Sequence, residues 1–448
     1  MNRDSRVRAA LIYVALLSVT SVLSSVTALA REAKGMIDAA TRERVLHTVL
    51  KKLNEQYVFP ETARKMEVAI RERMARKEYD RLTDGQAFAE TLTRDLREVC
   101  QDKHLRVMYS PDPLPRDNGR PMDPPQEAID EMRRQVTREN FGFERVEVLP
   151  GNLGYLKINY FVDPEWMGDT LRAAFDYLGG TDALIIDLRD NGGSMSEQAI
   201  PRVCSYLFEK PTHINSLYWR PSGKTTDYYT LAQVPGKRYL NKPVYVLTSA
   251  RTFSGAEEFA YDLQNLKRAT LIGETTGGGA NGGGDIRIDD HFAVWIPVGR
   301  AINPITKTNW EGVGVKPEFP VPAYKALHTA RLLAIEALVD KTTDERWKGR
   351  LKEVLTELRQ NPPAVRKITF RLKGFPDAKS VAVAGTFNGW SDSATRLTRQ
   401  GDIWTTETEA EPGRHMYKFV IDGQWMTDPD NPQTANDRQF VNSLLIVP

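Results

Sequence analysis

Residues 183–193 read ALIIDLRDNGG, and this stretch decides the fold of the central part of the chain. A short apolar run that ends in charged residues is typical of a strand buried on both faces of a sheet. Two further runs of this kind, VYVLT at 244–248 and ATLI at 269–272, alternate with segments of helical periodicity. The alternation predicts an α/β core, in which functional residues gather beyond the carboxyl ends of the strands.

Outward from this core, the chain is predicted to be multidomain. Residues 36–107 show four-residue apolar spacing, which predicts an N-terminal helical bundle, and the proline-rich stretch 108–140 predicts a linker. The α/β core is expected over 141–335 and a helical linker over 336–365. From 366 to 448, runs of period two alternate with Asn-Gly, Asp-Gly and Pro-Gly turns. That pattern is typical of an all-β, immunoglobulin-like sandwich.

Residues 1–30 have the pattern of a secretory signal peptide. A start with three arginines precedes an apolar stretch that ends in Ala-Leu-Ala at 28–30, a small-residue cleavage site. The alternative is an uncleaved membrane anchor, because the apolar stretch is just long enough to span a bilayer. We expect cleavage, no stable membrane span afterwards, and a periplasmic or secreted protein.

The composition excludes several classes of function. The 448 residues include 61 Lys and Arg against 59 Asp and Glu, a formal net charge of +2, so nucleic acid is not expected as a partner. The two cysteines, Cys100 and Cys204, exclude a disulfide scaffold and a four-cysteine zinc site. No H-E-x-x-H pair occurs among the six histidines. We therefore expect neither a metal nor a cofactor.

Ser254 follows the apolar run 244–248 and stands at the predicted start of a helix. Free backbone amides and the positive end of the helix dipole meet at such a position. A hydroxyl there can attack a carbonyl while adjacent amides hold the developing oxyanion. Gly255 would supply one amide, and the Gly192-Gly193 turn would bring a second close. The alternative is that Ser254 only caps the helix.

A glycine-rich stretch, GETTGGGANGGG at 273–284, follows the third apolar run. It lacks the Gly-Lys-Ser/Thr ending of a phosphate-binding loop, which disfavours a nucleotide site. We expect a flexible rim against which an extended peptide can lie.

Four motifs in this order carry a resemblance to a known family: DLRDNGG at 187–193, SARTFSGAE at 249–257, RATLIGETTGG at 268–278 and EGVGVKPE at 311–318. The chain resembles the tail-specific (C-terminal-processing) serine proteases. It is most similar to the branch related to interphotoreceptor retinoid-binding protein and the tricorn core protease. The resemblance covers roughly residues 36–335 and implies a crotonase-like or ClpP-like core.

The resemblance also implies roles for single residues. Ser254 matches the nucleophile, His104 in the Asp-Lys-His motif matches the general base, and Glu311 matches the acidic residue that orients it. The amides of Gly255 and of Gly192 or Gly193 match the oxyanion hole. Taken singly, a histidine such as His104 is more often structural than a general base, and the alternative for Glu311 is an ion pair with Arg300 or Lys307.

Two features depart from the family pattern. The glycines at 277–279 contain no lysine, so a serine–lysine dyad is not expected and catalysis would run through His104. The peptide-gripping PDZ domain is missing as well. Substrate choice would then come from the helical domain, the glycine rim or the C-terminal module.

The C-terminal residues resemble the glycogen-binding module of the AMP-activated kinase beta subunit, on motifs that include AGTFNGW at 384–390 and GRHMYKFVIDGQW at 413–425. Sugar faces stack on indole rings, and hydroxyls need nearby polar groups. Trp390 and Trp425 match the stacking pair, and Lys418 and Asn442 match the polar contacts. Arg438 replaces an apolar residue of the family. Trp404 fits a core role, and the alternative is that Trp390 and Trp425 are buried too.

Together these observations predict a serine-type peptidase that hydrolyses peptide bonds by a Ser-His-Glu acyl-enzyme mechanism. Its partners would be a peptide or protein substrate and, through the C-terminal module, an alpha-glucan or other glycan. The alternative is a non-catalytic binding protein for an apolar ligand or a peptide on the same fold. A glycan hydrolase has least support, because no carboxylate pair in the core stands out.

Overall fold

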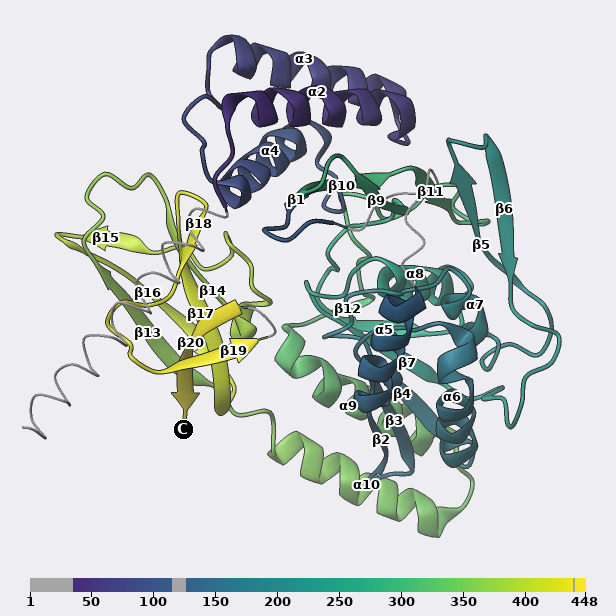
Figure 1. The fold of residues 1–448 in the computed structure, drawn as a ribbon. Coiled ribbons are helices and arrows are strands. Elements are labelled where there is room, and N and C mark those ends of the chain that lie inside the picture. The colour runs from purple at the N-terminus through teal and green to yellow at the C-terminus, as the bar shows by residue number, and fades with distance from the viewer. Residues whose placement is uncertain (1–34, 115–125, 438–439) are drawn as a thin grey trace, which may run out of the picture. The chain divides into compact units, whose positions relative to one another are not determined.

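The computed structural model of the protein describes residues 35–114, 126–437 and 440–448. Its contacts divide the chain into two compact units (Figure 1). Unit 1 holds the described residues up to 114 together with 218–225 and 281–300, and unit 2 holds the remainder. The predicted signal peptide lies outside the described residues. Within the described residues, no helix has both the length and the apolar character that a membrane span requires.

Unit 1 packs three helices against a small antiparallel sheet. The helices are α2 (Ala39–Gln56), α3 (Pro60–Ala75) and α4 (Gly85–Cys100). Side chains of Asp38 and Asp84 cap the first and third helices, as the residue type predicts. The sheet has the order β1-β10-β9, from β1 (Arg106–Tyr109), β10 (Phe292–Pro297) and β9 (Gly283–Arg287).

The expected helical bundle over 36–107 is therefore only part of this unit. Leu50, Leu53 and Phe88 of the helices share one core with Phe292 and Val294 of the sheet. The apolar spacing predicts the helices correctly. It does not reveal the sheet, because two of the three strands come from a hairpin within the segment predicted as the α/β core.

Unit 2 is built on a six-stranded sheet of order β12-β8-β7-β4-β3-β2. All pairs are parallel except β2 with β3. The strands are β2 (Phe143–Leu149), β3 (Leu153–Ile158), β4 (Ala183–Asp187), β7 (Val244–Thr248), β8 (Thr270–Gly273) and β12 (Phe319–Pro320). Every residue of β4 and β7 is buried, which confirms the prediction of strands covered on both faces.

Helices cover both faces of this sheet. On one face, α9 (Ala323–Lys341) and α10 (Glu345–Gln360) form a core with alternate strand residues such as Ile185 and Leu247. On the other, α6 (Pro164–Leu178) and α8 (Gly255–Asn265) contact β3 and β8. The segment 336–365, predicted as a helical linker, thus lies mostly in helices that are part of the core.

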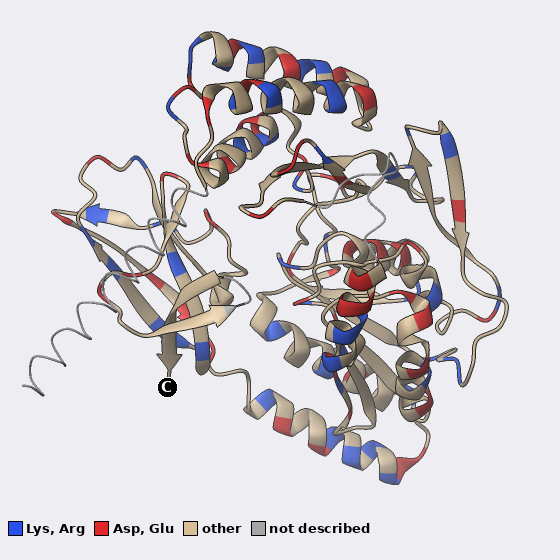
Figure 2. Ribbon diagram, in the orientation of Figure 1, with Lys and Arg blue, Asp and Glu red and all other residues tan. Residues whose placement is uncertain are grey.

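Shorter elements complete the unit. They are α5 (Gln126–Arg138), which falls within the predicted linker 108–140, η1 (Asn140–Gly142) and α7 (Ala199–Cys204). A further three-stranded sheet, not confined to unit 2, has the order β11-β5-β6, from β11 (Gly299–Ile302), β5 (His213–Trp219) and β6 (Lys224–Tyr229). Lysines and arginines are interspersed with acidic residues over the described elements (Figure 2).

The C-terminal region is rich in β-structure, as predicted. One sheet has the order β13-β16-β15 and the other β14-β17-β20-β19, with β18 paired to β17. The strands are β13 (Arg366–Lys373), β14 (Val381–Gly385), β15 (Thr398–Gln400), β16 (Ile403–Ala410), β17 (Gly413–Ile421), β18 (Gln424–Met426), β19 (Thr434–Asp437) and β20 (Phe440–Val447), with η2 (Thr386–Asn388) between β14 and β15. Phe370, Trp404 and Phe419 belong to its core, so the core role expected for Trp404 is confirmed.

Candidate active site

Ser254 stands in unit 2 between the carboxyl end of β7 and the first residue of α8. Its backbone has φ 54° and ψ −124°, a left-handed value of φ that non-glycine residues rarely adopt. Such strain persists only where the surroundings hold it, and it is frequent at reactive residues. The side chain is partly exposed. Ser254 therefore occupies a constrained turn that presents a hydroxyl at the start of a helix.

The loop after β4 packs directly against this turn. Gly193 has φ +126°, and a Cβ built on it would lie 2.9 Å from the Cβ of Ser254. A Cβ on Gly255 would lie 2.7 Å from Oγ of Ser194 and 2.9 Å from the amide nitrogen of Ser194. Glycine at both positions is what permits this approach.

The backbone amides of this region differ in their partners. Gly192 donates to the carbonyl of Asn159 at 3.3 Å, and Gly193 donates to Oδ1 of Asn191 at 2.9 Å. The amides of Gly255 and Ser194 have no acceptor within the described part of the chain. The amides of Gly255 and Ser194 therefore lie where the loop after β4 meets the Ser254 turn.

Glu257, one turn into α8, connects the Ser254 turn to the glycine-rich loop. Its carboxylate is fully buried and accepts the amide of Ser254 at 2.9 Å, the amides of Gly278 and Gly279 at 2.6 and 2.8 Å, and the hydroxyl of Thr276. Burial raises the pKa of Glu257, and the four donors oppose that rise. Each carboxylate oxygen receives two donors.

Glu311 lies on the other side of the same glycine loop, also in unit 2. Its Oε2 accepts the amide of Ala280 at 2.6 Å. The amide of Gly312 donates to the carbonyl of Gly278 at 3.0 Å, and the indole N–H of Trp310 donates to the carbonyl of Gly279 at 2.9 Å. The expectation of a flexible rim is wrong for residues 276–280, because hydrogen bonds to neighbouring segments hold this stretch.

His104 lies in unit 1, just after α4. Its ring stacks on Trp295 of β10 with centroids 5.0 Å apart, and its amide donates to Oδ1 of Asp102 at 3.0 Å. The Nδ1 atom lies 3.9 Å from Oδ1 of Asp102. Burial, with Arg106 and Arg97 contributing, lowers the pKa of His104 to about 4. The imidazole is therefore neutral at neutral pH, the state that a general base requires.

Asp102 is itself held in place within unit 1. Its Oδ2 accepts the side-chain amide of Asn281 at 2.9 Å and the hydroxyl of Tyr57 at 3.3 Å. Burial raises the pKa of Asp102 above its ordinary value.

The strand end at β4 carries a structural ion pair. Asp187, fully buried, accepts Nε of Arg189 at 2.9 Å and Nη2 at 2.6 Å, together with the hydroxyl of Tyr155 at 2.7 Å. The contacts with Arg189 and Tyr155 hold the pKa of Asp187 below its usual value despite burial.

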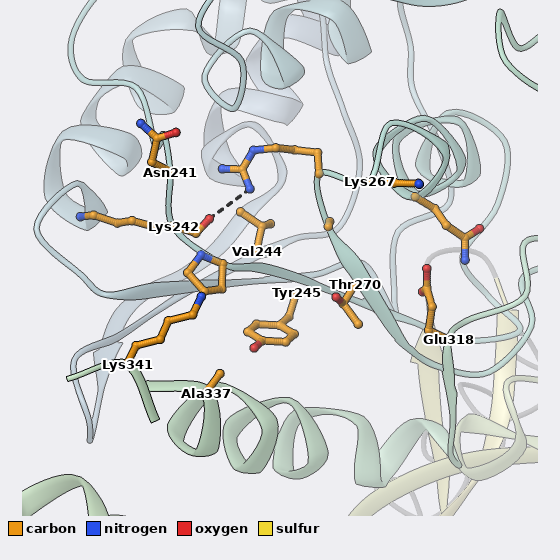
Figure 3. A pocket seen from close by; sticks show the side chains of 13 residues that line it. Asn241, Lys242, Val244, Tyr245, Lys267, Thr270, Glu318, Ala337 and Lys341 are labelled. Atoms are coloured by element: carbon orange, nitrogen blue, oxygen red, sulfur yellow. Dashed lines mark hydrogen bonds between the residues drawn. The ribbon is translucent and has the colours of Figure 1, made fainter. Parts of the chain in front are cut away.

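A cavity of about 540 Å³ in unit 2 lies at the amino ends of β7 and β8 (Figure 3). Val244 and Thr270, which start β7 and β8, line it. Two of the four cations that line it bind backbone oxygens: Lys242 donates to the carbonyls of Gly179 and Thr181, and Arg268 donates to three carbonyls. The cavity therefore lies at the amino ends of strands whose carboxyl ends lead to Ser254.

In the C-terminal module, the two predicted stacking residues lie together. The rings of Trp390 and Trp425 have centroids 6.3 Å apart at an angle of 40°, and Trp425 is 44% exposed. Trp390 packs on Ala382, Ala384 and Val420, whose strand neighbours Val383 and Phe419 belong to the module's core. The tryptophan pair therefore lies on the face of the β14-β17 sheet that points away from this core.

The two predicted polar residues are placed differently. Lys418 holds its ammonium 5.7 Å from the ring centroid of Phe440, which is 55% exposed and was not singled out by the sequence. Asn442 is buried, and its amide contacts Sδ of Met416 at 3.9 Å. Arg438 lies outside the described residues.

Two parts of the chain match known protein families. Residues 152–321 match the model described as Peptidase family S41, and residues 31–150 match the N-terminal domain of Peptidase_S41 in eukaryotic IRBP. In both of these segments the chain is therefore similar to family S41 peptidases. The predicted class, a serine peptidase, is thereby confirmed. Residues 367–448 match the glycogen recognition site of AMP-activated protein kinase, which confirms the appended carbohydrate-binding module.

The curated relatives match the C-terminal module. The 5'-AMP-activated protein kinase subunit beta-1 of Rattus norvegicus is 35% identical over 92 residues, 20% of this chain and 33% of the relative. Subunit beta-1 of Sus scrofa is 35% identical over 82 residues, 18% of this chain and 64% of the relative. The chain thus spans about a third of the rat protein it matches.

Solved structures align with a larger part of the chain. A lipoprotein from Streptococcus agalactiae is 15% identical, with a TM-score of 0.45, over 66% of this chain and 96% of the other. The photosystem II D1 C-terminal processing protease is 15% identical, with a TM-score of 0.40, over 64% of this chain and 95% of the other.

Five residues of the candidate sites were missed by sequence reasoning: Asp102, Ser194, Glu257, Trp295 and Phe440. Glu257 had a local signal, because Ser254 and Glu257 form the S-x-x-E pattern of a capping box. Asp102 stands in the Asp-Lys-His motif already quoted. Trp295 and Phe440 reach their sites through strand pairing, which the local sequence does not report.

Proposed function

We propose that the protein hydrolyses peptide bonds with Ser254 as nucleophile, His104 as general base and Glu311 as the acidic residue that orients His104. The observation that carries the proposal is the constrained turn of Ser254 at the start of α8, with two amides beside it that have no acceptor among the described residues. A serine that only capped a helix would need neither the left-handed backbone nor the close approach of Gly193.

We assign the oxyanion hole to the amides of Gly255 and Ser194. The sequence suggested Gly255 together with Gly192 or Gly193. Both of those glycine amides already donate to acceptors, so neither is free to bind a developing oxyanion. Gly193 contributes by its lack of a side chain, which lets Ser194 reach the Ser254 turn.

The chemistry then follows from the protonation states. Neutral His104 takes the proton of the Ser254 hydroxyl as Oγ forms a bond to the substrate carbonyl carbon. The imidazolium returns that proton to the leaving amine, and the C–N bond breaks to leave an acyl-enzyme. Water then gives a proton to His104 as its oxygen bonds to the ester carbonyl carbon; the bond from that carbon to Oγ of Ser254 breaks, and the imidazolium returns the proton to Oγ as the acid product leaves. The carboxylate of Glu311 stabilises the imidazolium formed in each half-reaction.

For the C-terminal module we propose a glycan platform on the outer face of the β14-β17 sheet. Trp390 and Trp425 would stack on sugar rings, and Lys418 would donate to hydroxyls. Asn442, buried in β20 beside β17, is predicted to supply a further polar contact, and the exposed ring of Phe440 extends the apolar surface. An alpha-glucan is the ligand that this arrangement fits best.

Three finer assignments belong to the same proposal. The parallel sheet with helices on both faces supports a crotonase-like or ClpP-like class for the core, and the two antiparallel sheets support an immunoglobulin-like class for the module. The residue pattern of 1–30 supports secretion or a periplasmic location, with a membrane anchor as the alternative if cleavage fails.

A fluorophosphonate probe tests the catalytic assignment. We expect the probe to label the wild type at Ser254 and not to label Ser254→Ala. In His104→Ala we expect the labelling rate to fall by several orders of magnitude. A peptide chloromethyl ketone should attach to both Ser254 and His104 in one molecule, because it alkylates a histidine within reach of the serine it occupies. A folded wild type that neither probe labels would favour the alternative, a non-catalytic binding protein.

A further inference from the structure

The buried carboxylate of Glu257 has no role in the mechanism above, yet it contacts the turn that carries Ser254 and the glycine loop that donates a hydrogen bond to Glu311. It accepts the amide of Ser254 at 2.9 Å and the amides of Gly278 and Gly279 at 2.6 and 2.8 Å. The next amide of that loop, Ala280, donates to Glu311 at 2.6 Å. A continuous chain of hydrogen bonds and backbone thus joins Ser254 to Glu311 through Glu257.

The four hydrogen-bond donors around Glu257 need carboxylate oxygens that carry no proton. Three of the four groups bound to Glu257 are backbone N–H groups, and the fourth is the hydroxyl of Thr276. The Thr276 oxygen also accepts the amide of Val315 at 2.7 Å, so its proton is directed at Glu257. An ionised carboxylate offers two acceptor oxygens and satisfies all four donors, whereas a protonated acid or an amide cannot.

Glu257 is not placed to act on substrate. Its side chain is fully buried, and both oxygens are saturated with donors from the protein. A general acid or base must exchange a proton with the reacting atoms. Whatever Glu257 contributes must therefore pass through the residues it holds.

We propose that ionised Glu257 is a positioning residue for peptide hydrolysis, which fixes the backbone of Ser254 and, through the 278–280 loop, the carboxylate of Glu311. This inference rests on the proposed function. The bond to the Ser254 amide holds the left-handed turn, and the bonds to Gly278 and Gly279 set the position of Ala280. One carboxylate thereby fixes the positions of both Ser254 and Glu311. A displacement of about 1 Å of either residue would lower the reaction rate about 100-fold.

The decisive variant is Glu257→Gln, which keeps the shape and replaces one acceptor oxygen with an N–H₂ group. We expect kcat for a peptide substrate to fall about 100-fold with KM changed less than threefold, because the binding surface is untouched. The matched control is Glu258→Gln on the same helix. Burial raises the pKa of Glu258 to about 7, so loss of its charge at neutral pH is expected to change kcat less than threefold.

A second pair of variants keeps the test valid if Glu257→Gln does not fold. Thr276→Val removes one donor, and because that hydroxyl lowers the pKa of Glu257, its loss should raise the pKa. The acidic limb of the kcat profile should then move to higher pH, while Thr276→Ser, which keeps the hydroxyl, should restore the wild-type limb. A merely structural role would lower stability without moving this limb.

The outcomes separate the two proposals. Absence of probe labelling and hydrolysis in the wild type would overturn the proposed function itself. An active wild type with a folded Glu257→Gln that keeps kcat within threefold, or a Thr276→Val whose pH limb does not move, would overturn the positioning role alone.

Discussion

Substituting Gly193 with alanine tests the geometry around Ser254 most directly. The new Cβ would lie 2.9 Å from the Cβ of Ser254 and 3.2 Å from the carbonyl oxygen of Phe253. Both neighbours belong to the constrained turn, so neither can yield without moving Ser254. The residue would also have to keep φ near +126°, which a residue with a side chain rarely adopts.

The magnitude follows from these two effects. A disfavoured backbone conformation costs about 1–3 kcal/mol, and forcing an extra methyl group into a packed site costs about 1–3 kcal/mol. We expect Gly193→Ala to lower the free energy of unfolding by about 2–6 kcal/mol. If the turn yields instead, Ser254 shifts and the rate of labelling by a fluorophosphonate falls about 100-fold.

Gly192→Ala is the matched control, one residue away. A Cβ on Gly192 meets nothing within 4 Å, and the residue is exposed. We expect its unfolding free energy to stay within about 0.5 kcal/mol of the wild type, with unchanged labelling. Urea denaturation and labelling kinetics measure both quantities. Equal behaviour of the two variants would refute the close approach of Gly193 to Ser254.

Three further predictions follow from other contacts. In an NMR titration, His104 should change protonation near pH 4 rather than 6.5. Because burial depresses the pKa of the folded state, unit 1 should lose about 3 kcal/mol of unfolding free energy as the pH falls from 6.5 to 4. A titration midpoint at pH 6.5 would contradict the burial of His104. Arg189→Met should lower unfolding free energy by about 3–5 kcal/mol, because it leaves the buried Asp187 without its cation; a thermal melt unchanged by this variant would show that the pair is dispensable. Trp425→Ala should weaken binding of a linear maltooligosaccharide about tenfold in calorimetry with an intact fold, whereas Trp404→Ala should cost the module about 3–5 kcal/mol of stability; undiminished affinity in Trp425→Ala would place the glycan elsewhere.

The strands of the core were predictable because burial on both faces leaves a strong local signal. The expected run 183–188 is observed as Ala183–Asp187, and 269–272 as Thr270–Gly273. The position of Ser254 was predictable for the same reason, since the turn that carries it is bounded by a buried strand and a helix.

What the sequence did not reveal depends on pairing between distant segments. Val107 of β1 faces Val294 of β10, and no local pattern announces a partner so far along the chain. The glycine loop was misjudged for a related reason. Its composition indicates freedom of the backbone, but the carboxylates of Glu257 and Glu311, which arrive from elsewhere, remove that freedom.

The construction of unit 1 has a practical meaning for anyone who wishes to divide this protein. The helices that open the chain cannot be excised as a contiguous block, since Phe292, Val294 and Ile296 would lose the cover that those helices give them. A shortened enzyme that starts at the first strand of unit 2 would expose this apolar hairpin to water and invite aggregation. A workable graft would have to exchange residues 281–300 together with the amino-terminal helices, because the two segments form one hydrophobic core.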